Sequence, residues 1–174
     1  KIKVTEERAA EIYLSTHEKM EKAGYRHYEV SNYAHGKKYI CRHNTIYWNS
    51  APYLGLGPGA HSFDGRNRRW WNIKDVDKYL SYWQSASTDQ RFLPSGLQTE
   101  EHLNEKQQAL ERIALGFRTK EGVRRAFVEN LEGGREAICH LCELGFLQGN
   151  ADRVWPTPRG MLMADGLAKY FLQP

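Results

Sequence analysis

Apolar positions recur at helical spacing at the start of the chain and then give way to a strand-like stretch. Thr5 can cap a helix, and Gly24 is a suitable residue just past its end. The residues between them that fit one helix face are Ala9, Ile12, Tyr13, Met20 and Ala23. Residues 25–32 then predict a strand. A helix, a glycine and a strand make one α/β unit, which needs neighbouring strands to form a stable sheet.

The middle of the chain predicts fewer regular elements. Residues 33–58 predict a long irregular stretch with a short helical piece near Tyr47, and its aromatic residues argue against disorder. The dipeptide Asp64-Gly65 predicts the turn of a hairpin over residues 60–71. A short helix is expected at residues 76–83. The polar stretch that follows, residues 85–95, is the predicted linker between two domains.

The last part of the chain predicts a compact helical domain with a small hairpin. Thr99, followed by Glu100 and Glu101, favours a helix start, because carboxylates suit a helix N-terminus. The other expected elements are helices at residues 121–131 and 135–144, a hairpin within 146–155 and a last helix at 157–172. This order is typical of a winged helix. The apolar residues expected in its core are Leu110, Ile113, Phe117, Phe127, Ile138, Leu141, Leu144, Leu162 and Leu167.

Composition limits the class of protein only loosely. The 174 residues suit one large domain or two small ones. Aromatic residues make up 12% of the chain, with ten Tyr and five Trp, which is high. The net charge of +4 permits an anionic ligand without requiring nucleic acid. No run of 18 apolar residues is present, so we expect no membrane span.

The cysteines indicate a reducing compartment, and we expect a cytoplasmic protein. Three cysteines, Cys41, Cys139 and Cys142, have no spacing typical of a disulfide framework. The pair Cys139 and Cys142 could suggest zinc, but no second pair of ligands follows at similar spacing. We interpret them as two small apolar residues on one helix face.

Three motifs lie within about 35 residues, and a simple core strand or helix does not need their mixture of residues. They are YEVSNYA at residues 28–34, CRHNTIYW at 41–48 and YLGLGPGAHS at 53–62. They resemble the oxygen-independent coproporphyrinogen III oxidase family of radical S-adenosylmethionine proteins, and within it the HemW-like branch of haem chaperones. The segments LGFRTKEG at 115–122 and PTPRG at 156–160 are similar to the small C-terminal domain of that family.

The resemblance implies an α+β fold in three parts. Residues 1–34 would be the last helix–strand unit of the radical S-adenosylmethionine α/β barrel. Residues 35–95 would be an aromatic-rich cap and linker, and residues 96–174 a winged-helix-like C-terminal domain. The implied function lies in porphyrin and haem metabolism: oxidative decarboxylation of coproporphyrinogen III, or haem binding and delivery in the chaperone branch. The sequence leaves these two alternatives open.

The resemblance also implies S-adenosylmethionine and a 4Fe–4S cluster in the intact protein. The family's cluster motif, three cysteines spaced Cys-x3-Cys-x2-Cys, is absent here, and the chain begins at a lysine. We therefore expect a fragment that lacks the N-terminal radical S-adenosylmethionine domain. It would have no catalytic residue of its own and no radical chemistry alone.

Two groups of residues are candidates for ligand contacts. If residues 28–34 are the last barrel strand, Asn32 and Ala34 lie near the adenosine of S-adenosylmethionine, because barrel sites form at strand C-terminal ends. Alternatively they form a strand-end polar cluster. His43 is the candidate axial ligand for haem iron. The residues beside it would stack on a porphyrin or pair with a propionate: Tyr47, Trp48 and Arg42. Alternatively His43 only hydrogen-bonds its own turn.

A winged-helix nucleic-acid-binding module is the alternative from another class. Its reading helix, residues 135–144, would carry one Arg against two Glu and no Lys. A helix that enters a DNA groove normally carries clustered Arg or Lys. The charge pattern therefore favours packing against protein.

Overall fold

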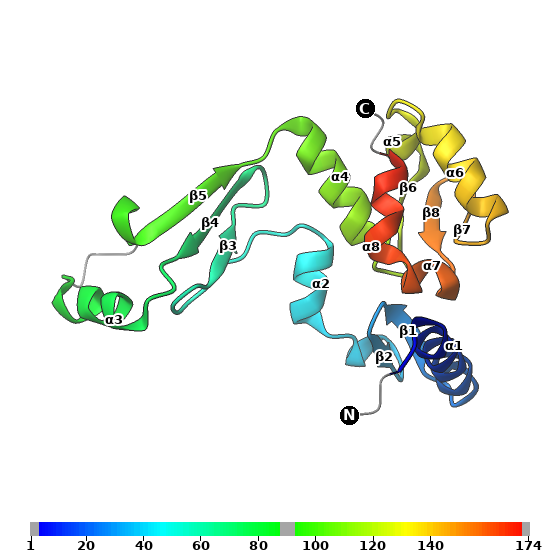
Figure 1. Ribbon diagram of the computed structural model, residues 1–174, viewed down its shortest axis with the longest axis horizontal. Coiled ribbons are helices and arrows are strands. Elements are labelled where there is room, and N and C mark those ends of the chain that lie inside the picture. Colours follow the sequence, from blue (N-terminus) through cyan, green and yellow to red (C-terminus); the bar gives the residue numbers. More distant parts are fainter. Residues whose placement is uncertain (1–3, 88–92, 172–174) are drawn as a thin grey trace. The chain divides into compact units, whose positions relative to one another are not determined.

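The computed structural model describes residues 4–87 and 93–171 of the chain (Figure 1). Helices and short antiparallel sheets are mixed along the described sequence. The chain divides into two compact units. The first unit combines residues 1–49 with 109–174, and the second unit is the intervening segment, residues 50–108.

The N-terminal part of the first unit is a helix followed by a tight hairpin. Helix α1 (Glu6–Lys22) begins as the sequence predicts, because the Thr5 hydroxyl accepts a hydrogen bond from the Arg8 backbone N–H. The expected single strand over 25–32 is instead two antiparallel strands, β1 (Arg26–Glu29) and β2 (Asn32–Ala34). The short helices η1 (Lys37–Tyr39) and α2 (Arg42–Trp48) follow, and α2 is the helical piece predicted near Tyr47.

The C-terminal part of the first unit holds its apolar core. Helix α4 (Glu105–Gly116) leads into a three-stranded sheet of order β6-β8-β7, with helices on the connections. The other elements are β6 (Val123–Arg124), α5 (Arg125–Glu129), α6 (Gly134–Glu143), β7 (Leu147–Gly149), β8 (Arg153–Pro156), α7 (Pro158–Leu162), α8 (Ala164–Leu167) and η3 (Ala168–Phe171). The core cluster is built around Ile113, Phe117, Val128, Ile138, Leu141, Val154 and Leu167.

Three expectations for this part were wrong in detail. The helix expected at 121–131 starts only at Arg125, because the preceding two residues pair with β8. The single last helix is broken at Met163 into α7 and α8. Leu144 and Leu162 were expected in the core, but they are exposed by 42% and 38%. Each lies at or next to a helix end, where the buried face of the helix is no longer continued.

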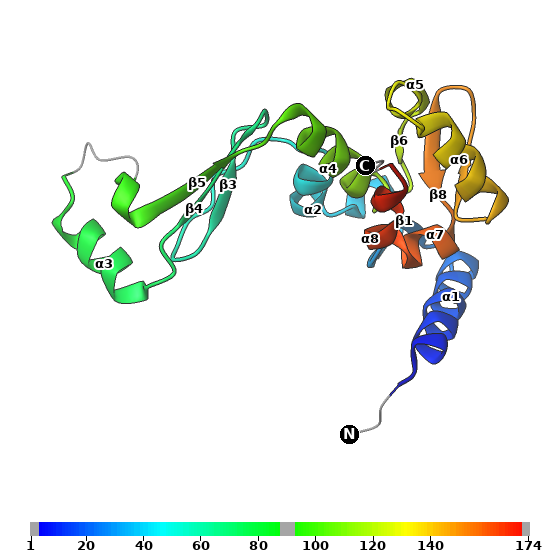
Figure 2. The ribbon, with the colours of Figure 1, turned by 45° about the horizontal axis from the view of Figure 1, so that its top comes forward.

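The second unit is a three-stranded antiparallel sheet with a helix. Strands β3 (His61–Phe63) and β4 (Arg68–Asn72) form the hairpin predicted from Asp64-Gly65, and β5 (Gln98–His102) pairs with β4 along its whole length (Figure 2). Helix α3 (Val76–Ser85) and the short helix η2 (Ser95–Leu97) connect them.

The helix expected from Thr99 was wrong, because residues 98–102 are strand β5. Helix α4 starts later, at a capping box formed by two side chains. The Gln107 backbone N–H donates to Asn104 Oδ1 at 2.9 Å, and the Asn104 backbone N–H donates to Gln107 Oε1 at 2.8 Å. This reciprocal pair satisfies two backbone N–H groups, so it fixes the start of the helix there.

The compact units do not divide where the sequence suggested. The units meet at residues 49/50 and 108/109, whereas domain ends were expected at residues 34 and 95. Helix α2 belongs with the β1–β2 hairpin because its side chains bond to β1, as described below. The expected linker, residues 85–95, lies partly outside the described residues. The assignment of residues 1–34, 35–95 and 96–174 to domains of an intact protein remains a prediction.

Candidate functional site

A buried carboxylate lies at the centre of a group of polar side chains in the first unit. Glu29, at the end of β1, is only 1% exposed. Its Oε1 accepts a hydrogen bond from Asn32 Nδ2 at 2.5 Å, and its Oε2 accepts one from Asn44 Nδ2 at 3.3 Å. The indole N–H of Trp48 also donates to Oε2. Burying a carboxylate is costly unless its oxygens are hydrogen-bonded, and here three neutral donors fill that role.

Trp48 connects this carboxylate to the C-terminal part of the first unit. The guanidinium of Arg118 lies over the Trp48 ring, 5.5 Å from its centroid. Arg118 also pairs with Asp165 on α8. A cation over an indole face adds attraction that a neutral contact lacks. Trp48 is thus held by its N–H and by one face of its ring. The sequence predicted that Trp48 stacks on a porphyrin, and this remains a prediction for the other face of the ring.

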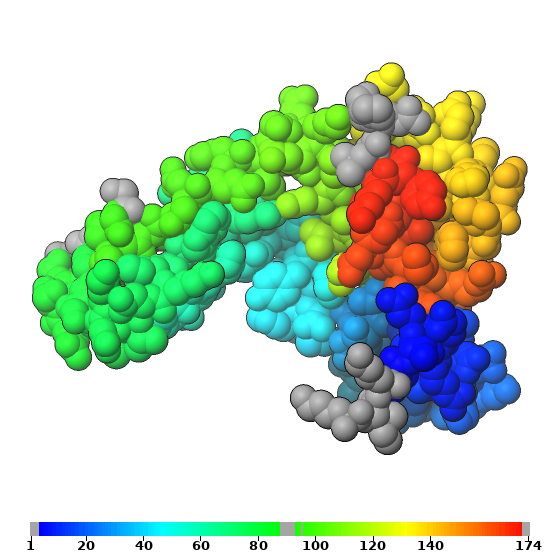
Figure 3. Space-filling model, viewed as in Figure 1, coloured from blue at the N-terminus to red at the C-terminus, as the bar shows by residue number. Residues whose placement is uncertain are grey.

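His43 presents its imidazole at the surface of α2. Both His43 and Arg42 are exposed, and the segment lies in the blue-to-cyan part of the surface in Figure 3. The His43 ring meets Tyr47, one helical turn later, edge to face with 4.9 Å between ring centroids. Neither imidazole nitrogen of His43 hydrogen-bonds to any part of the chain that the structure describes. The alternative, a histidine that hydrogen-bonds its own turn, finds no support there.

Asn32 and Ala34 lie on β2, beside the same carboxylate. Ala34 is 3% exposed and packs inside the first unit. The Asn32 amide nitrogen donates to Glu29, which leaves its amide oxygen for another partner. The arrangement matches the alternative of a strand-end polar cluster, and a contact of these residues with S-adenosylmethionine remains a prediction.

The turn between α4 and β6 pairs with β1, far away in sequence. The Val30 N–H donates to the Arg118 carbonyl at 2.9 Å, and the Lys120 N–H donates to the Tyr28 carbonyl at 3.0 Å. Glu29 and Thr119 form the antiparallel bridge between these two bonds. Residues 118–120 therefore act as a short third strand beside the hairpin.

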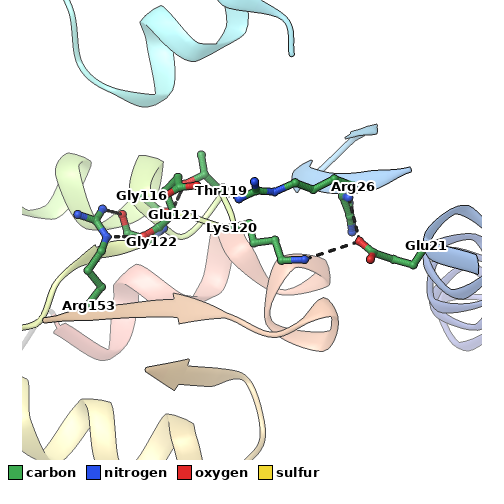
Figure 4. Close-up of polar contacts among 9 residues, drawn as sticks. Glu21, Arg26, Gly116, Thr119, Lys120, Glu121, Gly122 and Arg153 are labelled. Atoms are coloured by element: carbon green, nitrogen blue, oxygen red, sulfur yellow. Dashed lines mark hydrogen bonds and ion pairs between the residues drawn. The ribbon is translucent and has the colours of Figure 1, made fainter. Parts of the chain in front are cut away.

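Ion pairs and backbone contacts hold this turn in place, as Figure 4 shows. Lys120 Nζ lies 3.7 Å from Glu21 Oε1 on α1, and Arg26 Nη2 lies 3.1 Å from Glu121 Oε1. Arg153 on β8 donates to the carbonyls of Glu121 and Gly122 at 2.8 and 3.0 Å. The exposed pairs contribute little energy by themselves. Together with the backbone bridge, they set the direction in which the turn approaches β1.

Two histidines form the contact between α1 and β1. The Nδ1 atoms of His17 and His27 lie 3.1 Å apart, and the His27 ring stacks on Tyr33 with 4.2 Å between centroids. At that distance one Nδ1 must carry the proton and the other must accept. His27 is 1% exposed, and burial lowers its pKa below the ordinary value of 6.5. The contact therefore requires at least one of the two rings to be neutral, and burial favours the neutral form of His27.

An open apolar groove of about 470 Å³ lies beside this contact. It is formed by one face of α1 and by the turn between β1 and β2. Its lining residues are Val4, Ala9, Ile12, Tyr13, Thr16, Val30, Ser31 and Tyr33. Burial against this wall raises the pKa of Tyr13 to about 12, so its hydroxyl stays protonated and donates to the Val30 carbonyl at 2.9 Å.

Metal-binding groups are sparse in residues 4–87 and 93–171. Within those ranges, no three His, Cys, Asp or Glu side chains lie close enough together to hold a metal ion. Cys139 is exposed, while Cys41 and Cys142 are half-buried, and all three are free thiols. Burial raises the pKa of the Cys142 thiol. An axial imidazole on haem iron needs only one protein ligand, so the absence of such three-residue groups does not bear on it.

Several curated proteins have sequences similar to this chain. The chain is 33% identical over 150 residues to "Heme chaperone HemW" of Synechocystis sp., covering 86% of the chain. It is 34% identical over 152 residues to the protein of that name in Mycobacterium tuberculosis, again covering 86% of the chain. A 55-residue stretch is 47% identical to the mitochondrial "Radical S-adenosyl methionine domain-containing protein 1" of Bos taurus, covering 32% of the chain and 12% of that protein. The homologues of this chain are thus HemW haem chaperones and radical S-adenosylmethionine domain proteins.

The chain spans about a third of the length of these two HemW proteins: 34% of the Synechocystis protein and 36% of the Mycobacterium protein. No protein-family model matches it. Among solved structures, coproporphyrinogen III oxidase (HemN) of Escherichia coli superimposes with a TM-score of 0.61 at 12% identity, over 97% of the chain and 42% of that protein. The chain is therefore similar to HemW proteins in sequence and to HemN in fold. In the described part of the chain, no helix has the length and apolar character needed to cross a bilayer.

Proposed function

We propose that this chain forms the haem-contacting part of a HemW-like protein and that His43 is the axial ligand to the iron. The single observation that carries the proposal is the state of the His43 side chain. It is exposed, and neither ring nitrogen is taken by a hydrogen bond within the described residues. The names of the curated relatives support haem as the ligand.

The surroundings of His43 suit an axial ligand. A neutral imidazole is a common ligand of haem iron. The His43 ring packs against the Tyr47 ring in a T-shaped contact. Helix α2 itself is anchored by the bonds of Asn44 and Trp48 to Glu29. Arg42, the residue before His43, adds a guanidinium that can form bidentate hydrogen bonds with a carboxylate.

The other cofactors of the family concern a longer protein. The radical S-adenosylmethionine homologues imply S-adenosylmethionine and a 4Fe–4S cluster. Residues 4–87 and 93–171 offer no ligand set for a cluster, so we derive no reaction step through it. For S-adenosylmethionine we propose the edge contact through Asn32, whose amide oxygen is the group left by its bond to Glu29.

Two further functions have less support. Coproporphyrinogen decarboxylation rests on the fold likeness to HemN alone. The element order α4, β6, α5, α6, β7, β8 supports a winged-helix-like C-terminal domain, and hence a nucleic-acid module. However, α6 carries Arg135 against Glu136 and Glu143, so we propose that this domain packs against protein.

Haem titration of single variants tests the proposal. Haemin added to the chain should shift the Soret band, and His43→Ala should weaken binding and abolish the shift. His35→Ala is the matched control, since His35 is also exposed and lies eight residues earlier. Cys41→Ser tests a competing thiolate, because Cys41 is half-buried two residues away. A titration that is the same for the parent and for His43→Ala would remove His43 as the ligand.

A further inference from the structure

The segment that carries His43 is basic and contains no acidic residue. After Glu29, the next acidic residue along the chain is Asp64. Lys37, Lys38 and Arg42 lie between them, and all three side chains are exposed. Most lysines and arginines of a protein surface are interspersed with carboxylates. The positive charge of this segment is therefore not balanced locally in sequence.

The three cations also lack acidic partners in space. None of them forms an ion pair with any residue in the described ranges. The one acid close in sequence, Glu29, is buried and accepts from three other side chains. Lys38 Nζ lies 4.8 Å from the ring centroid of Tyr39, and Tyr39 is 61% exposed. A lysine held over an exposed aromatic ring is positioned beside a flat apolar surface.

We propose that Lys37 and Lys38 form a carboxylate-binding site that selects a flat ligand with acidic side chains, namely the propionates of a tetrapyrrole. This inference rests on the proposed function, because the ligand is the same. Lys37 is six residues from His43, so an extended chain could separate their backbones by at most ~20 Å. The proposal requires one ligand to place its iron at His43 and its propionates at the lysines. The exposed Tyr39 ring offers an apolar face, and the ammonium groups offer charge-assisted hydrogen bonds.

The test compares ligands with and without free carboxylates. The probes are haemin, haemin dimethyl ester and iron-free protoporphyrin, each titrated at low salt by absorbance and tryptophan fluorescence. The variant is Lys37→Gln/Lys38→Gln. The control is Lys19→Gln/Lys22→Gln, which removes the same charge from exposed positions on α1. Solvent-exposed ion pairs contribute little each, so we expect roughly threefold to tenfold weaker binding of haemin and protoporphyrin by the variant.

The ester should bind the parent and the variant equally well, and the control should match the parent with every probe. Added salt should reduce the difference between parent and variant, because it screens exposed charges. Equal affinity of parent and variant for haemin and protoporphyrin would overturn the inference. So would an equal loss in the α1 control, which would indicate a nonspecific effect of net charge.

The iron-free probe separates this inference from the proposed function. If protoporphyrin binding depends on the two lysines while His43→Ala leaves haemin binding and the Soret band unchanged, the carboxylate site stands and the axial ligand falls. If the Soret shift depends on His43 but the two lysine substitutions have no effect, the axial ligand stands and the carboxylate site falls. If none of the three probes binds, both the carboxylate site and the axial ligand are overturned.

Discussion

The indole N–H of Trp48 on α2 donates to the carboxylate of Glu29 on β1. This bond links the helix that carries His43 to the hairpin that precedes it. Because Asn32 and Asn44 donate to the same carboxylate, a single buried charge organises three segments of the first unit. The site proposed for haem therefore depends on a side chain that need not touch the ligand.

Removal of the buried carboxylate should destabilise the first unit. Glu29→Ala leaves three side-chain donors without their acceptor, and each buried unsatisfied group is costly. We expect a loss of about 2–4 kcal/mol in the free energy of unfolding, measured by urea denaturation followed by circular dichroism. Glu18→Ala, on the exposed face of α1, is the control and should change stability by less than about 0.5 kcal/mol. A Glu29 variant as stable as this control would contradict the arrangement.

Stability should fall as the pH is lowered through the mid-sixes, because of His27. Its pKa in the folded state is lowered by burial from 6.5. Below pH 6.5 the unfolded chain therefore binds a proton that the folded chain does not, and folding becomes less favourable. The loss approaches about 1.4 kcal/mol per pH unit for this one group, until the pH reaches the folded-state pKa.

Melting temperatures between pH 8 and pH 5 measure this effect. In His27→Phe the pH dependence should be flatter than in the parent, whatever its absolute stability. His35→Asn alters an exposed histidine and should keep the parent's slope. A slope that survives in His27→Phe would assign the effect to other groups.

Gly122→Ala should be much more destabilising than Gly145→Ala. Both glycines have positive φ, 60° and 72°, so both substitutions carry the cost of a left-handed residue, about 1–2 kcal/mol. A Cβ at Gly122 would also lie 2.0 Å from the Val154 carbonyl oxygen, whereas a Cβ at Gly145 meets nothing within 4 Å. We expect an additional loss of about 1–3 kcal/mol for Gly122→Ala. Equal losses in thermal denaturation would contradict the close approach of β8 to this turn.

Alkylation should distinguish the two cysteines of α6. Cys139 is exposed, whereas Cys142 is half-buried. Burial raises the pKa of the Cys142 thiol, so Cys142 has less thiolate at neutral pH. Iodoacetamide at pH 7.5, followed by peptide mass spectrometry, should label Cys139 first. Cys142→Ser should leave the rate at Cys139 unchanged. Zinc bound in a stoichiometric amount and protecting both thiols would show that the pair is a metal site.

Local signals in the sequence predicted the elements that depend on neighbouring residues. The Thr5 cap, the Asp64-Gly65 turn and the helix near Tyr47 are examples, since each depends on hydrogen bonds or backbone angles within a few residues. The same reasoning was wrong for residues 98–102. Thr99 and two glutamates do suit a helix start, but pairing with β4 and the bonds of Arg68 to Glu100 favour a strand. The Asn104–Gln107 capping box was a signal for the true start and was missed.

The candidate site could be predicted only in part. The sequence singled out His43 and its neighbours by residue type, but it assigned no ligand contact to Glu29. That Glu29 collects donors from Asn32, Asn44 and Trp48 depends on how α2 folds back on β1, which no residue spacing reveals. One signal was available: Glu29 lies between Tyr28 and Val30 in the predicted strand, and a carboxylate buried there needs partners.

The bridge between Glu29 and Thr119 also bears on how this region can evolve and be synthesised. It joins two parts of the first unit that are separated by the entire second unit. During synthesis, the edge of β1 that pairs with residues 118–120 stays unpaired until those residues have left the ribosome. Yet each doubling of the intervening length adds only about 0.6 kcal/mol of closure entropy. A change in the length of the second unit would therefore cost little closure entropy, provided that the hairpin, α2 and the C-terminal core still fit one another.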